Sequence, residues 1–230
     1  MKKKILVLSL VISLVAITAL GVTLAYFTAT RDVTNTFTMG NVDILLREPA
    51  WDGFDFDDEE IGTPDAQNPA LGYNEAKPLL PGDTAAKDPQ VKNVGSNPAY
   101  VRLKVTISNY EGFRAASEMY EGEEDIDIIG DVVIGLNTTD WIPAGDGVVV
   151  GDTITYTFNY NGILASGNAT NPLFTGIALP SQLDKELAPL QESGFTIAVK
   201  AEAIQAENFA NAGAAFSALD GQTTPTLPPT

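Results

Sequence analysis

Alternation of apolar and polar residues is the dominant pattern of the chain, and it predicts a protein built mainly from β-strands. Segment 99–107 places valine, leucine and isoleucine at every second position, with arginine, lysine and threonine between them. Segment 153–160 alternates isoleucine, tyrosine and phenylalanine with threonine and asparagine. A period of two is typical of a strand with one buried face, so these segments predict antiparallel sheets that cover a core.

Weaker patterns complete the expected order of elements. Further strands are expected at 33–39, 42–46, 84–94 with a bend at Pro89, 126–136, 147–150, 173–179 and 195–203. Helical spacing predicts short helices at 111–121, 180–191 and 211–219. Turn residues at 95–98 and at Asn161–Gly162 predict two hairpins, which would join 84–94 to 99–107 and 153–160 to a strand that starts at Ile163. The sequence therefore predicts an all-β fold, an antiparallel jelly-roll or Ig-like sandwich with short helical insertions.

One folded domain is expected over residues 26–219. Within it, residues 48–77 read as an acidic and polar loop insertion, because the run from Asp52 to Glu60 is followed by proline, glycine and asparagine. Residues 220–230 read as a flexible tail rich in proline and threonine. The tail ends in L-P-P-T, the first part of a sortase signal whose remaining parts do not follow in this sequence.

The acidic run raises the question of a calcium site, because carboxylate oxygens are the ligands that calcium prefers. The candidate ligands are Asp52, Asp55 and Asp57. Their spacing does not match the D-x-[DN]-x-[DN]-G pattern of a calcium loop. A solvated acidic loop is the alternative that fits better, and no metal or other cofactor is expected.

The first 25 residues have the layout of a secretory signal peptide. Three lysines precede the apolar run Ile5–Val22, and small residues then occupy the −3 and −1 positions of a peptidase site. A permanent membrane anchor is the alternative, since the run is long enough to span a bilayer. We expect cleavage after residue 25 and export of the remainder. The residues assigned to the cleavage site are Thr23, Ala25, Tyr26 and Phe27.

Composition narrows the function further. The 230 residues include 13 basic and 30 acidic side chains, with no histidine and no cysteine. Without these two residue types the chain cannot form a Ser-His-Asp triad, a cysteine nucleophile, a disulfide or an H-E-x-x-H zinc helix. The negative charge argues against nucleic acid as a partner, because phosphate recognition needs a basic surface. We therefore expect a protein that is not an enzyme and has no catalytic residues.

Three segments together resemble the TasA/camelysin (CalY) family of Gram-positive bacteria. Ala25–Thr28 reads A-Y-F-T, the type of motif that ends the signal of substrates of the signal peptidase SipW. Leu80–Val105 carries the pattern P-G-D…K-D…N-x-G-S, and Val199–Phe209 contains an A-x-Q-A ending. The resemblance covers the signal, the first strands and the last strand, while about residues 110–180 match by pattern only.

The resemblance implies a secreted structural subunit of biofilm matrix fibres. In this family the N-terminal strand of one subunit inserts into the sheet of its neighbour, which is a form of β-augmentation. The alternative is that the first strand pairs within its own sheet. The expected polymerisation strand runs from Phe27 to Met39, and its side chains assigned to the neighbour's groove are Phe27, Val33, Phe37 and Met39.

The expected partners and location follow from this resemblance. They are identical subunits in a homopolymer, a SipW-type signal peptidase and an accessory anchor protein, with the membrane contacted only through the uncleaved signal. The expected location is the extracellular matrix or the cell surface. The alternative functions are a monomeric surface adhesin or spore-coat protein, and a camelysin-like metallopeptidase, which the absence of histidine disfavours.

Overall fold

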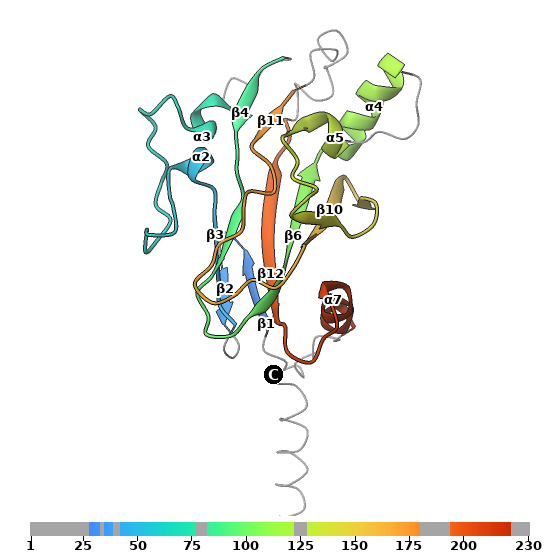
Figure 1. Cartoon of the computed structure of the whole chain (residues 1–230). Helices are drawn as coiled ribbons and strands as arrows, with labels where there is room; N and C mark the ends of the chain where they lie inside the picture. The colour runs from blue at the N-terminus through green and yellow to red at the C-terminus, as the bar shows by residue number, and fades with distance from the viewer. Residues whose placement is uncertain are drawn as a thin grey trace, which may run out of the picture.

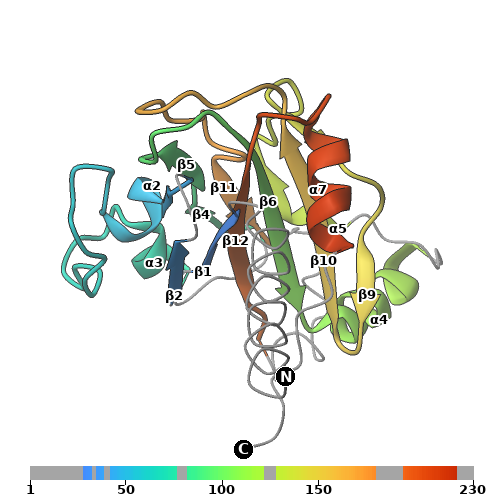
Figure 2. The same cartoon turned by 90° about the horizontal axis from the view of Figure 1, so that it is seen from below.

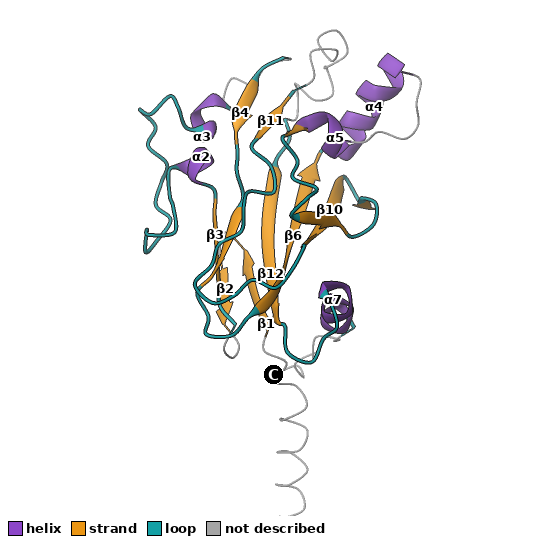
Figure 3. Cartoon of the chain, in the orientation of Figure 1, coloured by secondary structure: helices purple, strands orange, loops and turns teal. Residues whose placement is uncertain are grey.

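Antiparallel strands form most of the regular structure, and short helices lie around them (Figure 1 and Figure 3). The computed structural model describes residues 28–32, 35–38, 42–76, 82–121, 128–179 and 194–221. The strands are β1 (Thr28–Asp32), β2 (Asn35–Thr38), β3 (Ile44–Arg47), β4 (Thr84–Ala86), β5 (Gln90–Asn93), β6 (Ala99–Ser108), β7 (Val133–Ile134), β8 (Trp141–Pro143), β9 (Val148–Val150), β10 (Thr153–Tyr160), β11 (Gly176–Ala178) and β12 (Ile197–Gln205).

The largest sheet has the order β2-β1-β12-β6-β10-β8, and β9 also pairs with β10. Its centre is the long antiparallel pair of β6 and β12, which runs from Ile107 opposite Ile197 to Ala99 opposite Gln205. These strands form where the alternation is strongest, so the predictions for 99–107, 153–160 and 195–203 are confirmed.

Two smaller sheets complete the β-structure, with the orders β4-β11-β7 and β3-β5. The expected strand 84–94 is divided between them around Pro89, a residue that cannot donate a backbone hydrogen bond to a sheet. Its second half, β5, pairs with β3, whereas β6 pairs with β12 and β10. The predicted hairpin between 84–94 and 99–107 is therefore wrong, because residues 95–98 carry the chain from one sheet to another.

The main hydrophobic core joins the three sheets. Trp141 of β8 is fully buried in it, donates its indole N–H to the carbonyl of Asn171 at 3.1 Å, and meets the ring of Tyr160 edge-on at 5.3 Å. Burying a tryptophan in this way leaves its one donor satisfied. The other largest buried side chains are Phe174, Ile44, Leu103, Ile107, Ile128, Leu173 and Ile204.

The described helices are α2 (Pro49–Asp52), α3 (Gly72–Glu75), α4 (Tyr110–Glu121), α5 (Ile128–Val132) and α7 (Ala212–Asp220). The helices expected at 111–121 and 211–219 are confirmed, and the one expected at 180–191 lies outside the described residues. No helix in the described ranges is both long and apolar enough to cross a membrane.

The strand expected at 126–136 is wrong for most of its length. The described part begins with α5, and only Val133 and Ile134 form a strand, β7. Ile128, Ile129 and Val132 of α5 are all buried in the core. A short run of isoleucine and valine fits a buried helical turn as well as a strand. Periodicity alone therefore predicted a strand where the structure has the helix α5.

The hairpin predicted at Asn161–Gly162 is also wrong. The φ of Gly162 is 147°, but Asn161 has no positive φ, so the two-residue turn that such a hairpin needs is not formed. After the turn, however, Leu164 forms an isolated bridge with Ala99 instead of returning beside β10. The place beside the end of β10 is taken by β8, whose Trp141 pairs with Tyr160.

Candidate functional site

The N-terminal strand β1 lies between β2 and β12 at one edge of the large sheet. It pairs with β12 from Thr28 opposite Ile204 to Arg31 opposite Ala201, and with β2 from Ala29 opposite Thr38 to Asp32 opposite Asn35. Figure 1 shows this hairpin as the blue arrows at the foot of the sheet. The structure thus has the first strand paired within its own sheet.

This geometry corrects the expectation of one continuous strand over 27–39. Residues 28–32 and 35–38 are two short strands, and they pair with each other. Strand β1 ends at Asp32 and strand β2 begins at Asn35, and both are residue types that favour turns. Of the expected polymerisation residues, Phe37 lies in β2 opposite Thr30. Phe27, Val33 and Met39, like the cleavage-site residues Thr23, Ala25 and Tyr26, lie outside the described residues.

The strand that receives β1 is β12, and its β1-facing side is here called the β12 edge (residues 197–205). Only Ala201–Ile204 are covered by β1, whereas the whole of β12 pairs with β6 on the other side. On the inner face Val199, Ala201 and Ala203 are buried in the core, as the alternation predicted. Strand β12 is therefore held along its whole length by β6. Its β12 edge is covered only in part, by the short strand β1.

An ion cluster on the other face, with Arg102 and Glu202 buried at its centre, holds β12 in place; we call it the Arg102 cluster (Arg102, Lys104, Lys200, Glu202, Asp220). The Arg102 guanidinium contacts Glu202 of β12 at 2.5 Å and Asp220 at the end of α7 at 2.5 Å. The ammonium groups of Lys104 and Lys200 lie 3.2 and 3.4 Å from the Glu202 carboxylate. Glu202 is also the residue opposite Thr30 of β1.

The charges of this cluster stabilise each other. Burial alone would raise the pKa of Glu202, but Arg102 and Lys104 outweigh it and hold the pKa below its ordinary value. The hydrogen bond from Arg102 lowers the pKa of Asp220. Burial alone would lower the pKa of Arg102, but its hydrogen bonds to Asp220 and the charge of Glu202 raise it.

Helix α7 covers the Arg102 cluster. Its first turn is capped by the Asn211 side chain, which accepts a hydrogen bond from the Ala214 N–H at 2.9 Å. Phe216 of the helix lies under the Arg102 guanidinium, 4.4 Å from the ring centroid. Together with Tyr100 and Ile204 it forms a second, smaller apolar cluster. The helix contacts β6, β10 and β12, and Figure 2 shows it beside β10.

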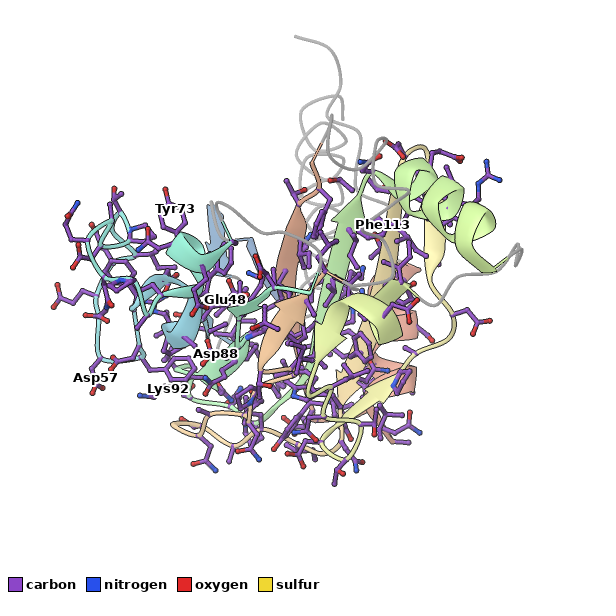
Figure 4. The ribbon with its side chains drawn as sticks, turned by 90° about the horizontal axis from the view of Figure 1, so that it is seen from above. Glu48, Asp57, Tyr73, Asp88, Lys92 and Phe113 are labelled. Atoms are coloured by element: carbon purple, nitrogen blue, oxygen red, sulfur yellow. The ribbon has the colours of Figure 1, made fainter. Side chains whose placement is uncertain are left out.

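A second buried ion pair ties the 48–77 insertion to the core; we call it the Lys87 cluster (Glu48, Trp51, Asp52, Lys87, Asp88). The Lys87 ammonium lies 2.7 Å from Oε2 of Glu48 and 4.5 Å from the centre of the Trp51 ring. Asp88 accepts a hydrogen bond from the Ala50 N–H at 2.8 Å, at the start of α2. Figure 4 shows Glu48 and Asp88 on the same side of the molecule.

In the Lys87 cluster the negative charges are poorly compensated. Oε1 of Glu48 is buried with no hydrogen-bond partner. Burial raises the pKa of Glu48, and the opposing attraction of Lys87 does not cancel it. Burial likewise raises the pKa of Asp52 and of Asp88, and the negative charges of these two carboxyls add to the rise at Glu48.

The calcium candidates are not brought together as a metal site. Asp52 accepts from the N–H of Phe54 at 2.9 Å, and Asp55 accepts from the N–H of Asp57 at 2.7 Å, so both carboxylates form local turns. Figure 4 places Asp57 at the outer rim of the molecule. Among the described residues no group of three or more acidic side chains is arranged to hold a metal ion.

The 48–77 insertion is a more structured element than the predicted open loop. The helices α2 and α3 stand near its two ends, and Arg47 donates to the carbonyls of Asp55 and Asp58, both at 2.9 Å. Leu71 is buried. The acidic run is therefore held against the body of the protein by backbone contacts as well as by the Lys87 cluster.

Sequence reasoning missed both ion clusters. It placed Arg102 on a solvated face, because arginine and lysine alternate there with apolar residues. Comparisons of the chain with models of protein families, with curated proteins and with solved structures find no match. The pairing of β1 with the β12 edge is therefore the feature from which we argue a function.

Proposed function

We propose that the chain is a secreted structural subunit of an extracellular fibre, related to the TasA/camelysin family and folded as a jelly-roll or Ig-like sandwich. Its polymerisation would use the N-terminal strand. The observation that carries this proposal is the pairing of β1, the first described segment of the chain, with Ala201–Ile204 of the β12 edge. A short hairpin at a sheet edge, here β1 with β2, can be exchanged for the same hairpin of another copy without loss of backbone hydrogen bonds.

In a free subunit β1 fills its own β12 edge. In the fibre β1 leaves it, and the β1 segment of the next subunit fills the place in the same register. Each subunit then donates one strand and accepts one, which is a head-to-tail contact that does not close and therefore produces a filament. Since β2 pairs with β1 in the described sheet, the β1–β2 hairpin is exchanged as a unit, and β12 stays in place because β6 and the Arg102 cluster hold it from the other side.

The other proposed partners follow from the same hypothesis. A SipW-type signal peptidase would release the strand from the membrane by cleaving after Ala25, and an accessory protein would anchor the fibre at the cell surface. The second candidate function is a monomeric surface adhesin or spore-coat protein. The same pairing favours this function if the strand stays where it is, since β1 and the β12 edge belong to one chain in this structure.

A disulfide between Ala29 and Ala203 tests which copy supplies β1. These residues are directly opposite each other, and the chain has no other cysteine to compete. The double variant Ala29→Cys/Ala203→Cys is exported from the full chain, purified after processing, concentrated at mildly acidic pH to reduce repulsion between acidic subunits, and then oxidised. A ladder of covalent multimers in denaturing gels, together with filaments in electron micrographs, is the expected result.

Two controls complete this test. The single variant Ala29→Cys can form dimers at most, so a ladder from it would show non-specific oxidation. A double variant that is linked only within one chain, with no filaments, would overturn the fibre and leave the monomeric function. A double variant that forms no disulfide at all would overturn the pairing on which both functions rest.

A further inference from the structure

Strand β9 carries exposed valines along the second edge of the large sheet; we call its outer side the β9 edge (residues 147–151). Figure 2 shows β9 on the opposite side of the sheet from β1 and β2. Val148 is 62% exposed, Val149 44% and Val150 71%. With Ile142 of β8 they are four of the eight large apolar side chains that are exposed in the described part of the chain. Single exposed apolar residues are ordinary, whereas a group of them along one edge indicates an interaction site.

The backbone of β9 is open to a further strand at its central residue. Val150 and Thr153 are opposite each other across a two-residue turn, and the next pair is Val149 and Ile154. In such a hairpin the pair beside the turn is hydrogen-bonded, and the next residue of the outer strand points its N–H and C=O groups outward. The Thr157 carbonyl follows the same alternation, because it accepts a bond at 2.8 Å from the segment between β8 and β9. The backbone groups of Val149 therefore face away from β10.

The neighbouring strand β8 is protected against added strands, and β9 is not. Pro143 ends β8 opposite Phe158, and the same alternation turns its backbone outward. A proline has no N–H to donate, and proline or lysine commonly protects the exposed edge of a sheet. Residues 144–152 contain no proline, lysine or arginine. The β9 edge can therefore accept a strand, whereas the adjoining edge of β8 cannot.

The charges at the two ends of the β9 edge select its occupant. Residues 146–152 read D-G-V-V-V-G-D, which is the same in both directions. A second copy paired antiparallel about Val149 would match valine with valine, but it would also set Asp146 opposite Asp152 at both ends. Like charges opposite each other destabilise a strand pair, and the net charge of −17 adds repulsion between copies. A strand with basic residues at its ends meets neither penalty.

We propose that the β9 edge binds an extended segment of a partner protein in which β-branched residues are flanked by lysine or arginine. The segment adds a strand beside Val149, and its backbone bonds to the outward N–H and C=O groups there. Its apolar side chains lie beside Val148 and Val150, and its basic ends lie near Asp146 and Asp152, which are both exposed. The site is on the opposite edge of the sheet from β1, so it does not depend on the proposed fibre.

A pair of peptides tests the site and its preference for charge. The fluorescent peptide R-T-V-V-V-T-R is titrated with the exported and processed protein at neutral pH, and its anisotropy is measured. Saturable binding is expected, and added salt should weaken it because the charges at the two ends are screened. The peptide E-T-V-V-V-T-E should bind roughly tenfold more weakly. Absence of saturable binding, or equal binding of the two peptides, would overturn the proposal.

Two changes at one position separate backbone pairing from side-chain contact. Val149→Pro removes the outward N–H but no bond to β10, and it should lower the affinity for R-T-V-V-V-T-R by roughly tenfold. Val149→Thr keeps the N–H and the β-branched shape, so it should bind nearly as well as the unchanged protein. Unchanged affinity in Val149→Pro, or equal losses in the two variants, would contradict the addition of a strand.

Sedimentation of the unchanged protein at neutral pH tests the second copy as the occupant. No pairing through the β9 edge is expected there, because Asp146 and Asp152 of the two copies would repel each other. A dimer that forms in the unchanged protein and is lost in Val149→Pro would show that a second copy fills this edge, and it would overturn the basic partner. The filament test with Ala29→Cys/Ala203→Cys concerns the other edge of the sheet, so either proposal can fail alone.

Discussion

Two buried ion pairs in the described part of the chain have similarly short contacts and opposite electrostatics. In the Lys87 cluster the Glu48 carboxylate meets one ammonium group at 2.7 Å and keeps one oxygen without a partner. In the Arg102 cluster the Glu202 carboxylate meets Arg102, Lys104 and Lys200 within 3.4 Å. Burial raises the pKa of Glu48, whereas the three cations lower that of Glu202.

The difference teaches that burial alone does not decide the charge state of a carboxylate. Removing a charge from water costs several kcal/mol, and the cost is offset only where enough opposite charges and hydrogen bonds surround it. The Arg102 cluster reaches this condition and connects β6, β12 and α7, so it supports the strand to which β1 is bound. The Lys87 cluster does not reach it, although it connects the 48–77 insertion to the core.

The largest expected effect is at Lys87, because it is the cation on which Glu48 depends. Lys87→Met should lower the free energy of unfolding at neutral pH by about 3–5 kcal/mol, since it leaves a buried carboxylate without its charge partner. Urea denaturation of the processed protein, followed by tryptophan fluorescence under conditions where it is monomeric, would measure the loss.

The double variant Lys87→Met/Glu48→Leu is the control for this prediction. It removes both charges and should recover most of the lost stability, because an apolar pair needs no compensation. A double variant as unstable as Lys87→Met would show that packing around the Lys87 stem and Trp51, not the charge, explains the loss.

Arg102 should be less sensitive, although it makes more contacts. In Arg102→Met the Glu202 carboxylate still has Lys104 and Lys200 beside it, so we expect a loss of about 2–3 kcal/mol, mainly from its charged hydrogen bonds. The same denaturation experiment, run alongside Lys87→Met, measures it. A loss larger than that of Lys87→Met would contradict the idea that the number of remaining cations decides the cost.

The long strands could be predicted from the sequence, and their partners could not. Alternation over 99–107 and 153–160 is strong because one face of each strand lies in the core and the other meets polar surroundings. The residues Asn161–Gly162 predict a two-residue hairpin turn, yet Asn161 does not adopt the positive φ that this turn needs, and β8 takes the place beside β10, where Trp141 fills the core. Local turn chemistry cannot tell which strand packs best at a given edge.

Both ion clusters were out of reach of sequence reasoning for the same kind of reason. Arg102 and Asp220 are 118 positions apart, and Glu48 and Lys87 are 39 apart. Nothing in an alternating strand shows that a helix from the end of the chain covers its polar face. The burial of Tyr100 and Arg102 follows from the apolar face of α7, with Phe216, and not from any feature of β6 itself.

The two clusters should respond to acid in opposite directions. The pKa of Glu48 is raised in the folded state, so the folded protein binds its proton first, and stability rises as pH falls through that pKa toward the ordinary value of about 4.3. The pKa of Glu202 is lowered, so its stabilisation is present above about pH 4.3 and is lost as pH falls through its folded pKa.

Unfolding free energies from pH 7 to pH 3 for the unchanged protein, Glu48→Gln and Glu202→Gln separate these contributions. The advantage of the unchanged protein over Glu48→Gln should grow between neutral pH and about 4.3. Its advantage over Glu202→Gln should shrink below that value. If the stability difference between the unchanged protein and Glu48→Gln does not change with pH, the raised pKa of Glu48 is contradicted. If the unchanged protein and Glu202→Gln lose equal stability in acid, the lowered pKa of Glu202 is contradicted.

The smallest effect is expected at an exposed ion pair, which isolates the role of burial. Glu111 and Arg114 of α4 meet at 2.7 Å, the same distance as Glu48 and Lys87, but their side chains are 58% and 41% exposed. Water already solvates both charges, so Glu111→Gln should change the free energy of unfolding by less than about 0.5 kcal/mol. The backbone N–H of Glu111, which donates to Asp152, is unaffected by the change. A loss in Glu111→Gln comparable with that of Lys87→Met would mean that contact distance, rather than burial and the number of partners, sets the cost of breaking an ion pair in this protein.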